Sequence, residues 1–376
     1  RGDWLQIWVY NSLSSFNYAR IRYNQQGLGV FSGTNDTVAP PITNSVFENN
    51  QNGLTLRIGS TANGDITSLI TNNVFRNNLY GIKVDALNGS ATGTGTAKPS
   101  LASNTFEGNS ILPLYLGWSA FPVYGTRNTF IGYPTPNQRL AIGISGTFMQ
   151  TGSLPVLIGY EGIEIPYVVL DNWRIASSAV VTIDPGTVIK VELAKQIEIL
   201  GTLNLQSSTM TDPIIFTSSR DDISGDTNGD GENTTPTAGD WSSLTAYNDS
   251  TVFKNVYVYY SSLGIRYYNN SVPDSYPLIE HCYFYDNKTS VYFESGSTAT
   301  TAYITHPKLI NNHFIRSQSF PIVLNGSSYW TEINSNTFTE SRYPAIGLLG
   351  NWYGSGVWEA IIGDSGDIFP YAVIGY

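Results

Sequence analysis

The sequence has little cysteine, little charge and no long apolar run. Cys282 is the only cysteine among 376 residues, so no internal disulfide can form. Charged residues make up 13% of the chain, the net charge is −10, and Lys and Arg form no run, which argues against a nucleic-acid partner. No apolar stretch approaches the roughly 18–20 residues of a membrane span. Because the chain opens on Arg1 rather than Met, we expect a mature product or a piece of a longer protein.

Asn, Ser, Thr, Gly and Tyr are abundant instead. This mixture suits β-strands joined by polar turns and argues against a helical or a disordered protein. The missing disulfides do not exclude an extracellular location, because each turn of a solenoid buries its apolar side chains against its neighbours. The composition therefore favours an all-β, repetitive fold.

A short motif recurs along the chain and predicts the fold. Six segments place Ile or Leu five residues before a Phe, and the spacing of successive phenylalanines is that of one solenoid coil. The phenylalanines are Phe47, Phe75, Phe106, Phe284, Phe314 and Phe338, with Phe130 as a degenerate seventh case. We predict a right-handed parallel β-helix in which they stack inside, about 4.8 Å apart per rung.

Asparagine marks the corners of this motif. It stands two residues before the Phe at Asn73, Asn104, Asn128, Asn312 and Asn336, and three residues after it at Asn50, Asn78, Asn109 and Asn287. An Asn at the same corner of successive coils can bond the backbone of the next coil and the next Asn, and it tolerates the left-handed turn conformation.

A longer repeat divides the chain. Gly2-Asp3-Trp4 matches Gly239-Asp240-Trp241 at an offset of 237, and Phe47 matches Phe284 at the same offset. We interpret residues 1–160 as the C-terminal part of one β-helix unit and residues 161–376 as a second, nearly complete unit. The inward positions are apolar in both copies, whereas the outward Arg20 and Arg22 become Tyr257 and Tyr259.

Residues 161–241 resemble a known family. The segments are Val181-Thr-Ile-Asp-Pro-Gly-Thr-Val-Ile-Lys190, Pro213-Ile-Ile-Phe-Thr-Ser218, Gly225-Asp-Thr-Asn-Gly-Asp-Gly231 and Gly239-Asp-Trp241. Their order resembles the opening coils of right-handed parallel β-helix repeats in large bacterial and archaeal cell-surface proteins. The resemblance implies a pectate-lyase-like fold and an exported, often array-forming protein, and it implies no particular reaction.

An acidic loop is the candidate metal site. Asp226, Asn228 and Asp230 alternate with other residues and precede Gly231 and Glu232, which is how a short loop wraps Ca²⁺. The twelfth position, where an EF-hand has Glu, is Thr237. Asp221, Asp222 or Asp240 could supply the missing oxygens, and the alternative is a solvated acidic loop. We expect a structural role for any bound calcium.

Tyrosines cluster on the outside of the second unit. With Val256, Val258 and Phe284 inward, the alternation of a strand points Tyr257, Tyr259, Tyr283 and Tyr285 outward. Such a stripe could bind sugar rings or be buried against another subunit, and the alternative is ordinary strand propensity.

Three functions follow from these observations. We expect a structural subunit of an extracellular filament, sheath or surface stalk, which assembles with itself by end-to-end stacking or belongs to a longer tandem array. The alternative is a glycan-binding adhesin or spike. A polysaccharide lyase or hydrolase is the least favoured hypothesis, because the one adjacent acid pair belongs to the calcium candidate and the basic residues are scattered. No catalytic residue is assigned, and we expect no enzyme.

Overall fold

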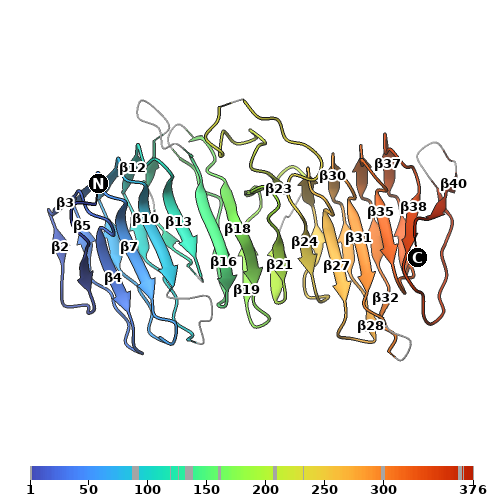
Figure 1. Cartoon of the computed structure of the whole chain (residues 1–376), viewed down its shortest axis with the longest axis horizontal. Coiled ribbons are helices and arrows are strands. Elements are labelled where there is room, and N and C mark those ends of the chain that lie inside the picture. Colours follow the sequence, from blue (N-terminus) through green and yellow to red (C-terminus); the bar gives the residue numbers. More distant parts are fainter. Residues whose placement is uncertain are drawn as a thin grey trace. The chain divides into compact units, whose positions relative to one another are not determined.

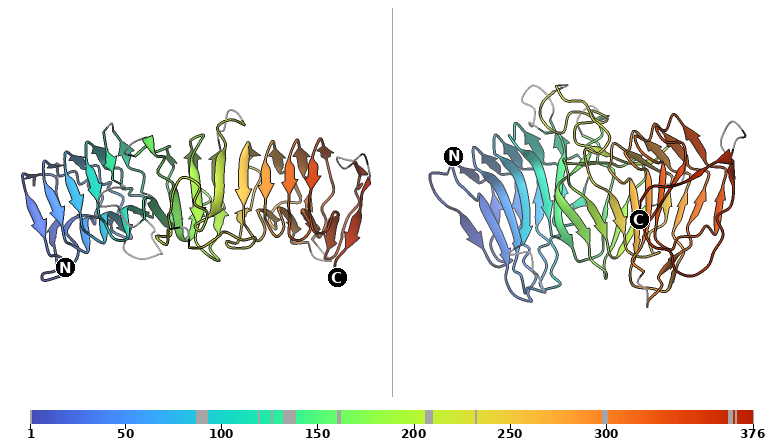
Figure 2. Two further views of the ribbon diagram at one scale, coloured as in Figure 1. Left: turned by 90° about the horizontal axis from the view of Figure 1, so that it is seen from above. Right: turned by 45° about the vertical axis from the view of Figure 1, so that its right-hand side comes forward.

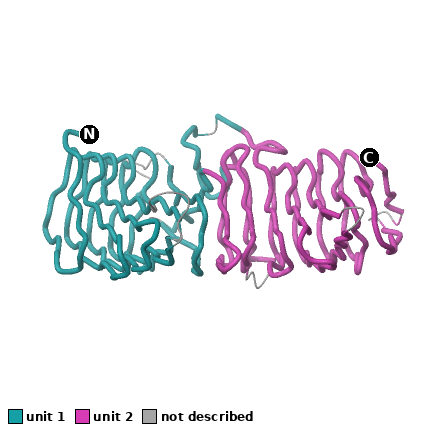
Figure 3. The backbone as a smooth tube through the Cα atoms, turned by 60° about the horizontal axis from the view of Figure 1, so that its bottom comes forward, with its two compact units in different colours: residues 1–170, 222–234 teal, residues 171–221, 235–376 magenta. Residues whose placement is uncertain are grey.

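The computed structural model describes residues 2–375 except 87–92, 119, 126, 132–138, 160–161, 206–209, 232, 298–300, 363–365 and 367. The described residues are all-β, without an α-helix, and wind through about 13 turns of a parallel β-solenoid. None of them forms a helix that is long and apolar enough to cross a membrane. Two compact units divide the chain (Figure 3), residues 1–170 with 222–234 and residues 171–221 with 235–376. The repeat boundary after residue 160 concerns sequence copies and stays a prediction.

Each turn of the first unit contributes one strand to each of three parallel sheets, as Figure 1 shows. The first sheet contains β1 (Ile7–Val9), β4 (Leu28–Ser32), β7 (Asn52–Ile58), β10 (Tyr80–Ala86), β13 (Leu112–Gly117) and β16 (Ile142–Phe148). The second contains β2 (Phe16–Asn17), β5 (Ile42–Thr43), β8 (Leu69–Thr71), β11 (Ser100–Ala102) and β14 (Val123–Tyr124). The third contains β3 (Arg20–Arg22), β6 (Val46–Glu48), β9 (Val74–Arg76), β12 (Thr105–Glu107) and β15 (Thr129–Phe130). β17 (Gly152–Leu154) and the start of β18 (Tyr167–Ile175) follow.

The second unit repeats this arrangement, with its strands side by side in successive turns (Figure 2). One face contains β21 (Ile197–Ile199), β24 (Leu244–Ala246), β27 (Ile265–Asn269), β31 (Val291–Ser295), β35 (Ile322–Asn325), β38 (Ile346–Leu349) and β41 (Tyr371–Val373). Another contains β20 (Val188–Val191), β23 (Ile214–Ser218), β26 (Val256–Tyr259), β30 (Tyr283–Tyr285), β34 (His313–Ile315) and β37 (Thr337–Thr339). The third face contains β19 (Val180–Ile183), β22 (Thr202–Leu205), β25 (Phe253–Lys254), β29 (Leu278–Glu280), β33 (Lys308–Ile310) and β36 (Glu332–Asn334). The short pairs β28 (Asp274–Ser275) with β32 (Ile304–Thr305), and β39 (Ile361–Ile362) with β40 (Ile368–Phe369), complete it.

The phenylalanines form an inner column in each unit, which confirms the central prediction. In the first unit the ring centroids of Phe47, Phe75, Phe106 and Phe130 lie 4.9, 5.1 and 4.9 Å apart. In the second, Phe284, Phe314, Phe338 and Phe369 lie 5.1, 5.0 and 4.2 Å apart. Except for Phe369, whose strand β40 pairs with β39, each strand pair aligns Phe with Phe in register, so the rings stack at the rung spacing.

The asparagines form ladders at two corners of the coil, also as predicted. At one corner, Asn104 donates its side-chain N–H to the Ile70 carbonyl at 2.7 Å and to the Asn128 side-chain oxygen at 3.1 Å. Its own side-chain oxygen accepts from the Asn73 backbone N–H at 3.1 Å. Because Asn73 and Asn104 are buried, their side chains satisfy backbone groups that no water could reach.

The left-handed conformation lies one residue earlier than the ladder, so that part of the corner prediction was wrong. Asn72 (φ 57°) and Asn77 (φ 54°) precede the ladder residues Asn73 and Asn78. The same two corners of the later coils place other residue types in this conformation, including His281, Asp286, Arg316 and Glu340. The turn needs a positive φ, and the buried amide that follows it holds the turn against the next coil.

Candidate functional site

In both copies, the repeated Gly-Asp-Trp segment ties its own turn to the turn that follows it. The Trp4 indole N–H donates to the Arg22 carbonyl at 3.0 Å, and the Trp241 indole N–H donates to the Tyr259 carbonyl at 2.8 Å. Trp4 and Trp241 also stand at matching bridges to the next turn. The two copies are therefore equivalent in structure as well as in sequence, and the segment has a structural role in both.

The opposite side of this turn differs between the copies. Trp241 and Leu244 are fully buried, whereas their counterparts Trp4 and Ile7 are 38% and 40% exposed and Leu5 is 66% exposed. In the second unit, β24 pairs with β21 on one side and with β27 on the other. In the first unit, β1 pairs with β4 on one side, and among the described strands no other pairs with it.

Four backbone hydrogen bonds cover the edge in the second unit. They join residues 240–247 to residues 194–199: Ala194 N to Asp240 O (2.7 Å), Ser242 N to Lys195 O (2.8 Å), Ile197 N to Ser243 O (3.0 Å) and Tyr247 N to Ile199 O (3.1 Å). The corresponding groups of the first unit, at residues 3, 5, 6 and 10, lie at the uncovered edge. We call residues 3–10 the first-turn edge.

The predicted tyrosine stripe lies on the outer side of the sheet formed by β26, β30, β34 and β37. Tyr257 pairs in register with Tyr283, and Tyr259 with Tyr285. The Tyr257 and Tyr283 ring centroids lie 4.8 Å apart, and His313 stacks on Tyr283 at 4.2 Å. The sequence prediction overlooked His313, although it stands directly before Phe314, as Tyr283 stands before Phe284.

The stripe is half-buried by its own neighbours. The Tyr257 hydroxyl donates to the Met210 carbonyl at 3.3 Å, and burial together with the nearby Tyr283 raises the pKa of Tyr257. The Arg316 guanidinium lies 4.2 Å above the Tyr285 ring and pairs with Asp286. The outward orientation is as predicted, but the rings form a packed layer and not an open platform.

A hollow of about 460 Å³ borders the stripe. Its lining combines one aromatic ring with charged and amide side chains: Pro236, Thr237, Ala238, Tyr260, Asp286, Lys288 and Gln318. Burial and the negative charges of Asp221 and Asp286 raise the pKa of Tyr260 to about 12, so its hydroxyl remains a hydrogen-bond donor at neutral pH.

The acidic loop is held together by hydrogen bonds between its own backbone and side chains. The Asp226 carboxylate accepts from the N–H groups of Asn228 (3.1 Å), Gly229 (2.7 Å) and Gly231 (2.8 Å). The Asn228 side chain donates to the Asp230 carboxylate at 3.0 Å. In the part of the chain that the structure describes, no three His, Cys, Asp or Glu side chains are grouped as metal ligands. Glu232 lies outside the described residues.

The flanking acids have partners within the protein. Asp222 belongs to the same compact unit as the acidic loop, whereas Asp221 and Asp240 belong to the other. Asp240 accepts from Ser218 at 2.7 Å and lies 3.4 Å from the Arg220 guanidinium. The Asp221 carboxylate accepts from the Thr217 hydroxyl at 2.5 Å. Calcium binding by the loop stays a prediction.

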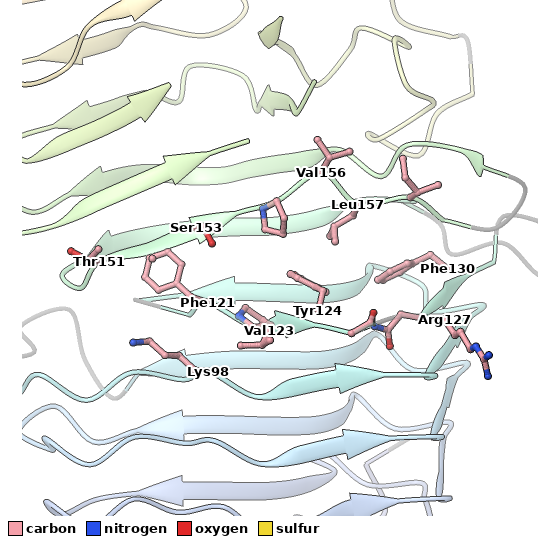
Figure 4. Close-up of a pocket in the computed structure, with 16 residues that line it drawn as sticks. Lys98, Phe121, Val123, Tyr124, Arg127, Phe130, Thr151, Ser153, Val156 and Leu157 are labelled. Carbon is pink, nitrogen blue, oxygen red and sulfur yellow. Dashed lines mark hydrogen bonds between the residues drawn. The ribbon is translucent and has the colours of Figure 1, made fainter. Parts of the chain in front are cut away.

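The first unit carries a groove of about 590 Å³ beside β14 (Figure 4). One wall runs from residue 121 to residue 130 and the other from residue 151 to residue 158. Phe121, Tyr124, Phe130 and Leu157 face the space between the two segments. The groove was not predicted from the sequence.

Comparison of the chain with protein-family models, with curated proteins and with solved structures gives no match. The function must therefore be argued from the geometry of the chain itself.

Proposed function

We propose that the chain is a structural segment of an extracellular filament, sheath or surface stalk, in which tandem β-solenoid units join end to end. One observation carries the proposal: in the second unit, the copy of the first-turn edge pairs in register with the coil before it and with the coil after it, so one solenoid turn continues onto another through this edge. A strand edge with unpaired N–H and C=O groups and exposed large apolar side chains is a template for another strand.

The second unit indicates what the covering coil is like. There, β21 lies in register beside β24, with Ile197 opposite Leu244 and Ile199 opposite Ala246. An equivalent coil over the first unit would place apolar residues opposite Ile7 and Val9. It comes from a second copy of the chain or from a further unit of a longer array. The family resemblance of residues 161–241 supports an exported protein.

Sedimentation velocity over a range of concentrations, together with electron microscopy, tests the proposal. We expect end-to-end assemblies of the isolated chain, and we expect Ile7→Lys to abolish them, because it places a charge at the first-turn edge. Leu69→Lys is the matched control, since Leu69 is 47% exposed on β8, away from that edge. Monomers at every concentration, or equal loss of assembly in both variants, would contradict end-to-end stacking.

The tyrosine-rich face of the second unit supports a second candidate function, glycan binding. The hollow beside Tyr260 offers a ring to stack on and the polar groups of Asp286, Lys288 and Gln318 as hydrogen-bond partners. A glycan array with the wild-type chain and with Tyr260→Ala tests it. Binding that the variant loses supports an adhesin, and absence of binding removes this candidate.

A structural calcium ion in the acidic loop is a further part of the proposal. Asp226 and Asp230 would supply carboxylate oxygens and Asn228 an amide oxygen, which are the ligands that Ca²⁺ prefers. Thermal unfolding with added Ca²⁺ and with a chelator should differ for the wild type and agree for Asp230→Ala. Equal melting of the wild type under both conditions would contradict it.

A further inference from the structure

The groove beside β14 lies along an unpaired strand edge. The Val123 N–H donates to the Pro99 carbonyl at 2.9 Å, and the Gly125 N–H donates to the Leu101 carbonyl at 2.7 Å. The N–H and C=O groups of successive strand residues point to alternate sides, so those of Tyr124 point away from β11, toward the groove. β14 is the terminal strand of its sheet as far as the chain is described.

The groove has an apolar floor and an apolar rim. Phe121, Phe130 and Leu157 are 4%, 2% and 7% exposed and form the floor. Val123 and Ile158 are 59% and 55% exposed at the rim. A strand laid along β14 would turn every second side chain toward the floor, where apolar residues are buried, and leave the alternate ones in water.

Positive charge lies at the two ends of the groove. Lys98 and Arg127 are the only charged residues in its lining, and Figure 4 shows them at opposite ends. Neither forms an ion pair with a described residue, although the whole chain has 29 acidic and 19 basic residues. A ligand with an anionic group at each end therefore complements the groove.

A hollow in the second unit forms without a charged residue in its lining. This hollow, between β36 and residues 360–362, measures about 210 Å³. Its lining residues are Ile333, Asn334, Ser335, Asn336, Ala360, Ile361 and Ile362.

We propose that this groove binds an extended peptide segment as an added β-strand. The segment has apolar or β-branched residues in its middle and an acidic residue at each end. Its backbone pairs with the N–H and C=O of Tyr124, its inward side chains contact Phe121 and Leu157, and its acids pair with Lys98 and Arg127. Main-chain pairing supplies the affinity, and the alternate side chains and the end charges supply the specificity.

Fluorescence polarisation with a labelled peptide Glu-Val-Thr-Val-Glu tests the proposal on the full chain. We expect saturable binding, weakened about twofold to fivefold by Lys98→Gln and by Arg127→Gln, which is the usual contribution of a surface ion pair. Arg342→Gln is the matched control, because Arg342 is an exposed arginine of the second unit. It should leave binding unchanged.

Two further peptides separate strand addition from simpler binding. A peptide with proline as its central residue cannot donate the backbone hydrogen bond there and should bind much more weakly. A Lys-Val-Thr-Val-Lys peptide should also bind more weakly, because its ends repel Lys98 and Arg127. Equal binding of the proline peptide, equal binding of the lysine peptide, equal weakening by Arg342→Gln, or no binding of the acidic peptide would each overturn the proposal.

Discussion

The Asn104→Ala substitution tests the buried ladder in the first unit. It removes a side chain that is fully buried and joins three turns of the solenoid. Its amide donates to the Ile70 carbonyl and to the Asn128 side chain, and its oxygen accepts from both the backbone and the side-chain N–H of Asn73. The truncation removes all four of these bonds; the Asn73 side chain keeps its bond to the Ile42 carbonyl, and the Asn128 side-chain oxygen keeps its bond from the backbone N–H of residue 104.

The cost follows from the number of buried groups left unpaired. The Ile70 carbonyl and the two Asn73 donors are buried, and each such group costs about 1–3 kcal/mol when its partner is removed. Local relaxation makes the three costs less than additive. We therefore expect Asn104→Ala to lower the free energy of unfolding by about 3–5 kcal/mol.

Asn63 is the matched control, because it makes the same kinds of bond in water. Its side chain is exposed, donates to Asn35 at 2.9 Å and accepts from the Thr94 backbone N–H at 3.0 Å. Water can replace these bonds, so Asn63→Ala should cost less than about 1 kcal/mol. Urea unfolding followed by circular dichroism measures both. Equal costs for the two substitutions would refute the argument that burial gives the ladder its strength.

Three further predictions concern single positions. Asn49 has a φ of 57°, so Asn49→Val should cost about 1–2 kcal/mol, whereas Asn49→Gly should cost less than about 1 kcal/mol in the same urea assay. Burial alone would raise the pKa of Glu48, but the side chains of Arg76 and Arg20 lower it. The stability that the Glu48 carboxylate gives the fold is therefore fully present above pH 4.5, its usual pKa, and is lost as the pH falls through the lowered pKa. Glu48→Gln should therefore cost about 1–3 kcal/mol at neutral pH, and the difference from the wild type should shrink in acid; a constant difference would contradict the ion-pair argument. Burial raises the pKa of the Cys282 thiol to about 12, so a thiol reagent should modify it only after unfolding.

The sequence was sufficient for the inner column and the ladders, because both depend on regular spacing. A Phe at each coil and an Asn at each corner must meet their counterparts once the coils stack in register. The left-handed corners could not be assigned correctly, because residues as different as Asn77, His281 and Arg316 adopt them. The preference of a residue type for positive φ is weak compared with the geometry that the turn imposes on this position.

The candidate sites were harder to predict, because they depend on what covers a surface. Alternation in the strand placed Tyr257 and Tyr283 outward, but it could not show that Met210 and His313 would lie against them. The groove beside β14 depends on the end of a sheet, where the next segment runs past without pairing. No local sequence pattern indicates where a sheet ends in this way.

The outward positions explain how one fold could carry different functions in its two units. On the third sheet of the first unit, Arg22, Glu48, Arg76 and Glu107 lie opposite one another in successive turns and alternate in charge.

The corresponding positions of the second unit hold Tyr259, Tyr285, Ile315 and Thr339. Each row lies beside the phenylalanine column of its own unit, which tolerates little change because its rings are stacked and, apart from Phe338, buried. The outer rows need only pair acceptably with their neighbours, as opposite charges or as packed rings. Selection for the scaffold therefore acts on the inner residues, and any unit-specific binding, such as that proposed for the groove and for the tyrosine-rich face, must come from residues on the outside.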